Sequence, residues 1–186
     1  MKSPMHKLFR SIITLTVLIV LGTGAGCKSY QLGHPAKLPF KTVYIQPAKN
    51  NSFAPQAQSL LSSEVREAVI RDGRVKLVAD PAAADAVLTM TITDYSRKGG
   101  TRSQSDTERA QDFDLRLRVE LDLYDQANDD FLFEGRRIEA HTISYVSDPY
   151  AGAANTQGLI RAEYNAMPRL TRELGRKAAD ELLGAW

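Results

Sequence analysis

The chain has 186 residues, with 24 Lys and Arg against 22 Asp and Glu, and it contains a single cysteine. The first 26 residues hold three of the basic side chains and no acidic one, so the remaining 160 residues carry 21 basic and 22 acidic side chains, a net charge of −1. Nucleic-acid-binding domains usually carry a marked basic excess, and this balance excludes a general role of that kind. The length suffices for one domain with a full hydrophobic core.

The N-terminus has the pattern of a secretory signal peptide. Three basic residues precede the apolar segment Ser11–Leu21, and small residues then lead up to Cys27. The apolar segment is about half as long as the roughly 20 residues that a membrane-spanning helix needs. We therefore expect residues 1–26 to be a removed signal peptide and not a permanent transmembrane helix.

The position of Cys27 resembles the lipobox of bacterial lipoproteins, in which the cysteine is acylated and becomes the new N-terminus. Ala25 and Gly26 fit that pattern, whereas Gly24 stands where leucine is usual. The alternative is an ordinary secreted protein with a cysteine near its cleavage site. The resemblance implies a lipid anchor, palmitate included, at Cys27. Lys28 replaces the aspartate that usually retains lipoproteins in the inner membrane, which implies the periplasmic side of the outer membrane.

After the signal peptide, the sequence predicts a tether over residues 27–40 and a single α+β domain over residues 41–186. The tether segment is polar, contains glycine and proline, and has no clear period. Thr42–Gln46 is a short β-branched and aromatic run that predicts the first strand, and Lys49–Ser52 is expected to be a loop.

A helix is predicted from Pro55 to Asp72, where apolar residues such as Leu61 and Val65 recur at helical spacing. Gly73 is a suitable residue to end it. A second short strand is predicted over residues 75–78, and residues 81–85 are expected to form a turn.

Three longer strands follow. Leu88, Met90 and Ile92 alternate with threonines, which predicts a half-buried strand over Ala86–Thr93. Phe113–Tyr124 alternates apolar and mostly charged residues without interruption and is the clearest strand of the chain. Phe131–Tyr145 changes its apolar parity, and a bulge near Gly135 would account for that change.

The last element is a predicted helix over Leu159–Leu183, which Pro168 should kink or split. Its expected apolar face consists of Ile160, Tyr164, Met167, Leu170, Leu174, Ala178 and Leu182. Long strands with short connections favour antiparallel pairing. The fold class is therefore α+β: a two-layer sandwich in which two amphipathic helices cover one face of a mainly antiparallel sheet.

No motif for catalysis, nucleotide binding or metal binding occurs in the sequence, so no enzyme activity, no metal and no cofactor are expected. The polar loop predicted over Ser96–Gln111 is the one candidate site. It joins two long strands, and Arg97, Lys98 and Arg102 make it a candidate contact for anionic groups such as phosphates. The alternative is a mobile hairpin loop without a ligand.

The order of segments along the chain is similar to that of one known family. Cys27 is followed by Tyr30, TVYIQPAKNNS (Thr42–Ser52) precedes a helix, and VKLVADPAAADAVLTMTITDY (Val75–Tyr95) leads into a long strand. A further alternating strand and a C-terminal helix complete the pattern. It resembles the LptE family of lipopolysaccharide-assembly lipoproteins of the outer membrane.

That resemblance implies a non-enzymatic partner that plugs the lumen of a large LptD-like β-barrel and binds lipopolysaccharide. Two other interpretations stay open on the sequence alone. One is a periplasmic lipoprotein of another envelope system, such as a peptidoglycan-synthase activator or a secretion component. The other is an enzyme, which the sequence supports least.

Overall fold

The computed structural model describes residues 38–101, 110–146 and 158–184. The predicted signal peptide, the predicted acylation site Cys27 and the loop residue Arg102 lie outside the described residues. The described residues belong to the compact unit that begins at Lys37.

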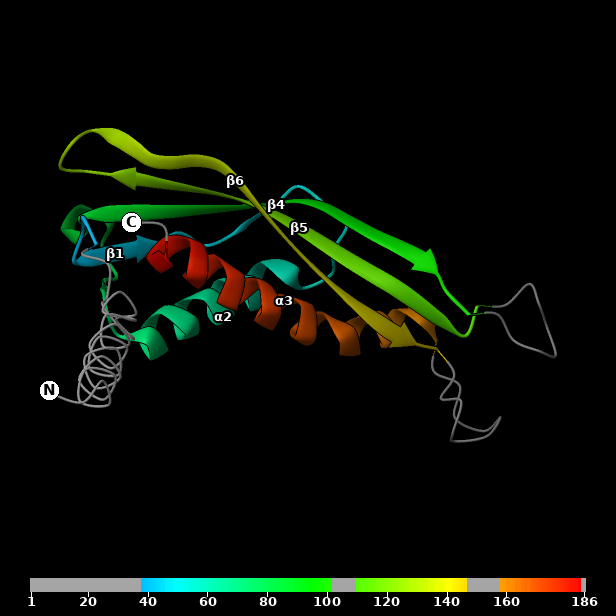
Figure 1. Cartoon of the computed structure of the whole chain (residues 1–186). Helices are drawn as coiled ribbons and strands as arrows, with labels where there is room; N and C mark the ends of the chain where they lie inside the picture. The colour runs from blue at the N-terminus through cyan, green and yellow to red at the C-terminus, as the bar shows by residue number, and fades with distance from the viewer. Residues whose placement is uncertain (1–37, 102–109, 147–157, 185–186) are drawn as a thin grey trace, which may run out of the picture. The chain divides into compact units, whose positions relative to one another are not determined.

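The described chain forms one six-stranded sheet with two α-helices on one of its faces (Figure 1). The strands are β1 (Thr42–Ile45), β2 (Lys49–Asn50), β3 (Lys76–Leu77), β4 (Ala86–Gly99), β5 (Asp112–Asp125) and β6 (Asp130–Tyr145). The helices are α2 (Ala57–Asp72) and α3 (Leu159–Gly184), and η2 (Pro81–Ala83) is a short 3₁₀ turn. The predicted α+β two-layer fold is confirmed.

The sheet has the order β3-β1-β4-β5-β6 and is mixed. β4, β5 and β6 pair antiparallel as expected, whereas β1 pairs parallel with both β3 and β4. The predicted loop at Lys49–Ser52 is partly wrong, because β2 pairs parallel with β4 at Thr91 and Ile92. Two residues with polar side chains give no periodic pattern, so only backbone pairing identifies this strand.

β4 extends beyond its predicted end at Thr93 to Gly99, so the predicted loop begins later than expected. The register against β5 shifts between Ile92 and Asp94, which marks a bulge. Because of the shift, Tyr95 pairs with the inward-facing Leu117 and thus lies on the helix side of the sheet.

The bulge predicted near Gly135 of β6 is confirmed. Gly135 has a φ of 66°, a conformation that glycine adopts without steric cost, and its N–H donates to Asp122 Oδ1 at 2.7 Å. The register shifts on the facing strand between Leu121 and Leu123. The insertion lets both Phe133 and Ile138 point into the core although they have opposite parity.

Helix α2 begins two residues later than predicted, at Ala57, because Gln56 takes a left-handed conformation with a φ of 57°. The predicted end is confirmed. Gly73 has a φ of 76°, and its N–H donates to the Val69 carbonyl at 3.2 Å, which satisfies one carbonyl of the last turn.

Helix α3 runs without a break through Pro168, so the predicted split does not occur. The predicted apolar face of α3 is buried from Met167 onward, as expected, but the prediction is wrong for the first turns of the helix. Ile160 is 83% exposed and Tyr164 is 58% exposed, whereas Glu163 is buried on the sheet side. A regular apolar period cannot reveal that the first turns of the helix bury a carboxylate against the sheet.

The core lies between the sheet and the two helices. Its largest fully buried side chains are Ile45, Leu61, Leu88, Met90, Ile92, Leu115, Leu117, Leu121, Leu123, Met167, Leu170 and Leu174. The helices meet closely at Gly175, where a Cβ atom would lie 2.8 Å from the Cβ of Glu64. Among the described helices, none combines the length and hydropathy needed to cross a bilayer.

Candidate functional site

The face of the sheet opposite the helices, here called the open face, carries an array of paired charges. Arg118 binds Glu139 through Nε at 2.6 Å and Asp94 through Nη1 at 3.3 Å. Arg116 also reaches Glu139, and Arg137 pairs with Glu120 at 3.3 Å. The side chain of Arg118, with that of Arg116, lowers the pKa of Glu139. Such exposed pairs contribute little stability each, but they leave the charged part of the open face nearly neutral.

Arg97, the first candidate residue of the predicted loop, lies on the other side of the sheet. Its Nη1 contacts both carboxylate oxygens of the buried Glu163 of α3, at 3.1 and 3.2 Å. The Tyr95 hydroxyl donates to Glu163 Oε1 at 2.7 Å. Burial, and then the hydrogen bond to Glu163, raise the pKa of Tyr95. These three residues, here called the clamp, fix the start of α3 to the end of β4.

Lys98 points away from the clamp. It pairs in register with Asp114 of β5, whose side chain lies on the open face, so Lys98 and Arg97 project to opposite sides of the sheet. The carboxylate of Glu163 compensates the charge of Arg97. The structure therefore does not bring the two described candidate residues together, and Arg102 lies outside the described residues.

A different basic feature lies on the outer side of α3. Arg161, Arg169, Arg172 and Arg176 are all exposed and follow one another at spacings of eight, three and four residues. At 100° per residue these positions fall within one narrow arc of the helix. We call this set the arginine ridge. This set is not among the predicted site residues, although the spacing of the arginines inside a predicted helix could have revealed it.

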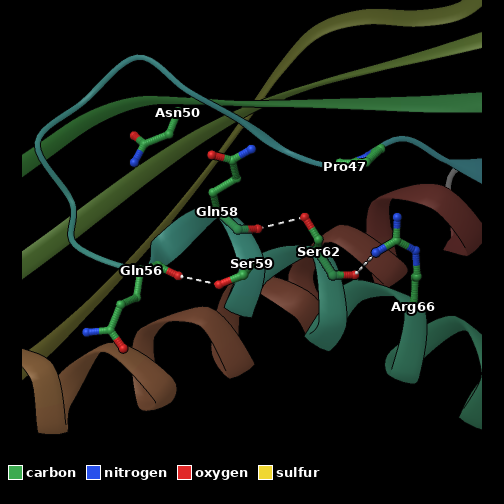
Figure 2. A pocket seen from close by; sticks show the side chains of 7 residues that line it. All are labelled: Pro47, Asn50, Gln56, Gln58, Ser59, Ser62 and Arg66. Atoms are coloured by element: carbon green, nitrogen blue, oxygen red, sulfur yellow. Dashed lines mark hydrogen bonds between the residues drawn. The ribbon is translucent and has the colours of Figure 1, made fainter.

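A shallow polar pocket of about 510 Å³ opens beside the first turns of α2 (Figure 2). It is lined by Pro47, Asn50, Gln56, Gln58, Ser59, Ser62 and Arg66. Ser62 Oγ accepts the Ala48 N–H at 2.9 Å and donates to the Gln58 carbonyl at 2.6 Å. Arg66 donates to the carbonyls of Ser62 and Ile45. The hydroxyl of Ser62 and the guanidinium of Arg66 thus tie α2 to the sheet.

Potential metal ligands are scattered over the fold. Within residues 38–101, 110–146 and 158–184, no three His, Cys, Asp or Glu side chains come together in a group that could hold a metal ion.

The fold is similar to several solved structures. A protein of Xanthomonas campestris matches with a TM-score of 0.57 at 11% identity, over 82% of this chain and 88% of that one. Lipoprotein B of Nitrosomonas europaea matches with a TM-score of 0.47 at 21% identity, over 83% of this chain and 88% of its own. A minor lipoprotein of Acinetobacter baumannii gives 0.48 at 14% identity, over 78% and 92% of the two chains. At 11% identity, the likeness to the Xanthomonas campestris protein concerns the fold alone.

No curated protein sequence matches the chain. The model of one protein family, described as LptE: Lipopolysaccharide-assembly, matches residues 40–182. That range contains all described strands and most of α3, and it agrees with the resemblance seen in the order of segments. The chain therefore belongs to the LptE family of lipopolysaccharide-assembly proteins.

Proposed function

We propose that this protein is an outer-membrane lipoprotein that assists a lipopolysaccharide-translocating, LptD-like β-barrel. The observation that carries the proposal is the family match over residues 40–182. In this proposal residues 1–26 are a signal peptide, residues 27–40 a tether that starts at the acylated Cys27, and residues 41–186 one domain. The domain acts on the periplasmic side of the outer membrane by binding and not by catalysis.

The open face suits a partner with a polar surface. Most of its charges are paired with one another, so a polar protein wall can replace water there at a small electrostatic cost. The interior of a large membrane β-barrel is a polar wall of that kind. We assign the open face to the barrel, except for Lys98 near the end of β4. Lys98 and Arg102, with Arg97 beside its carboxylate, are assigned to anionic groups of the glycolipid.

Detergent extraction tests the partner. We expect the wild-type protein, tagged at its C-terminus, to co-purify with a large outer-membrane barrel from solubilised envelopes. A Cys27→Ala variant, which lacks the acylation site, should recover at least several-fold less barrel at equal protein level, because the anchor concentrates the domain at the membrane. Recovery of a soluble partner such as a penicillin-binding protein, with no barrel, would contradict the proposal and favour another envelope system.

A further inference from the structure

Three of the four acids of α3 lie away from the side that carries its arginines. Glu163 is buried in the clamp, Glu173 pairs with Lys177 at 2.9 Å, and Glu181 pairs with Arg136 of β6 at 3.0 Å. The arginine ridge occupies the outer side. Along its length the exposed surface of α3 is therefore dominated by positive charge, although the chain without its predicted signal peptide has a net charge of −1.

Few acids oppose the ridge. Among the described residues, no carboxylate lies within ion-pair distance of Arg161, Arg169 or Arg176. Arg169 Nη2 donates to the Ile143 carbonyl of β6 at 3.1 Å, which satisfies one of its donors without neutralising its charge. Arg172 reaches Glu64 of α2 at a loose 3.7 Å, and its side chain remains 66% exposed. Asp180, exposed one turn beyond Arg176, is the nearest acid in sequence on that side. Like charges three and four residues apart destabilise a helix, so the ridge lowers the stability of α3. A bound anion would reduce this repulsion.

An apolar surface adjoins the N-terminal end of the ridge. Ile160 and Tyr164 are four residues apart on α3, next to Arg161, and their exposed fractions are 83% and 58%. The ridge spans roughly 22 Å from Arg161 to Arg176 at the rise of an α-helix. A ligand that fits both features carries several negative charges and also an apolar part.

Resting on the proposed function, we propose that the arginine ridge binds the phosphate groups of the glycolipid, while Ile160 and Tyr164 contact its apolar part. Guanidinium groups bind phosphate through paired N–H donors, and arginine is the residue best suited to this contact. Arg97 is less available, since Glu163 already occupies its Nη1. The ridge offers four exposed arginines, of which one contacts a carboxylate among the described residues, whereas Arg97 is bound to Glu163.

The test measures binding of fluorescently labelled lipopolysaccharide in detergent by fluorescence anisotropy. We use the chain from Lys28 onward, because the compact unit begins at Lys37 and the buried core begins at Phe40. Circular dichroism melts check that each variant is folded. The ridge variant carries Arg161→Gln, Arg169→Gln, Arg172→Gln and Arg176→Gln, in which glutamine keeps the helix propensity.

A control variant makes the same change in net charge elsewhere, at exposed residues with no ion pair among the described ones. It carries Lys41→Gln, Lys49→Gln, Arg71→Gln and Lys76→Gln. Each basic residue near an anionic lipid contributes about fivefold in affinity, so we expect the ridge variant to bind at least about tenfold more weakly and the control less than about threefold.

Two competitors identify the ligand group. Diphosphoryl lipid A should displace the labelled glycolipid at a lower concentration than monophosphoryl lipid A, and this difference should shrink in the ridge variant. Inorganic phosphate at the same concentration should displace nothing, since it lacks the apolar part.

Four results would overturn the inference. They are undiminished binding by the ridge variant, an equal loss in the control variant, displacement by inorganic phosphate alone, and a loss confined to an Arg97→Gln, Lys98→Gln, Arg102→Gln variant. All of them leave the proposed function standing, because the wild-type chain still binds the glycolipid. A wild-type chain that binds no lipopolysaccharide would instead contradict that part of the proposed function itself.

Discussion

Replacing Gly175 by valine should destabilise the fold by about 3 kcal/mol. The Cβ of any side chain at this position would lie 2.8 Å from the Cβ of Glu64 and 2.9 Å from its carbonyl carbon. Because one of these atoms belongs to the α2 backbone, a rotamer change cannot relieve the clash, and the two helices must move apart. Helix propensity alone would favour valine slightly over glycine and would raise the free energy of unfolding. A decrease in the free energy of unfolding would therefore show that the close packing at Gly175 outweighs helix propensity.

Chemical denaturation measures this effect, and thermal denaturation should show a midpoint lowered by roughly 10 °C for a unit of this size. Gly184→Val is the matched control, since a Cβ at Gly184 of the same helix meets nothing within 4 Å. We expect the control to change the free energy of unfolding by less than about 0.5 kcal/mol. Equal stability of Gly175→Val and the wild type would show that the helices do not pack as described.

Removing the carboxylate of the clamp should have the next largest effect. Glu163→Ala deletes the acceptor of the Tyr95 hydroxyl and the partner of Arg97, and we expect a loss of about 2 kcal/mol. Breaking a fully buried ion pair costs more, but the side chain of Arg97 is 50% exposed and water can solvate it after the change.

The clamp also makes a spectroscopic prediction. Burial raises the pKa of Tyr95, and the hydrogen bond to Glu163 raises it further, so Glu163→Ala should lower that pKa only part of the way to its ordinary value. Ultraviolet titrations are recorded with and without the Tyr95→Phe substitution, both in the wild type and in Glu163→Ala. The difference within each pair isolates the titration of Tyr95. Glu181→Ala, which breaks a half-exposed pair with Arg136, should cost less than about 0.5 kcal/mol and leave Tyr95 unaffected. An unchanged titration of Tyr95 in Glu163→Ala would show that the clamp does not form.

Much of the sheet could be predicted because its side chains alternate between core and water. The unbroken alternation over Phe113–Tyr124 fixed both the strand and its buried side, and the change of parity in the next strand located the bulge at Gly135. By contrast, the residues from Asp94 to Gly99 have loop-like composition. They form a strand because β5 offers them backbone partners, which no local pattern reveals.

The candidate site was harder to predict than the fold. Arg97 and Lys98 are equally good candidates in the sequence, because both are basic and lie next to each other. In the structure, the bulge before Asp94 directs Arg97 toward Glu163 and Lys98 to the open face. Pairing between residues 66 positions apart leaves no trace in a single sequence. The arginine ridge, in contrast, follows helical spacing and was accessible from the sequence once the helix was placed.

The most direct test of the central claim is the amount of lipopolysaccharide at the cell surface after depletion of this protein in its own host. We expect depletion to lower both surface lipopolysaccharide and the amount of assembled barrel. The wild-type gene should restore both, whereas Cys27→Ala should restore them only in part. If depletion leaves barrel assembly and surface lipopolysaccharide unchanged, the protein does not act in lipopolysaccharide assembly and the account is wrong.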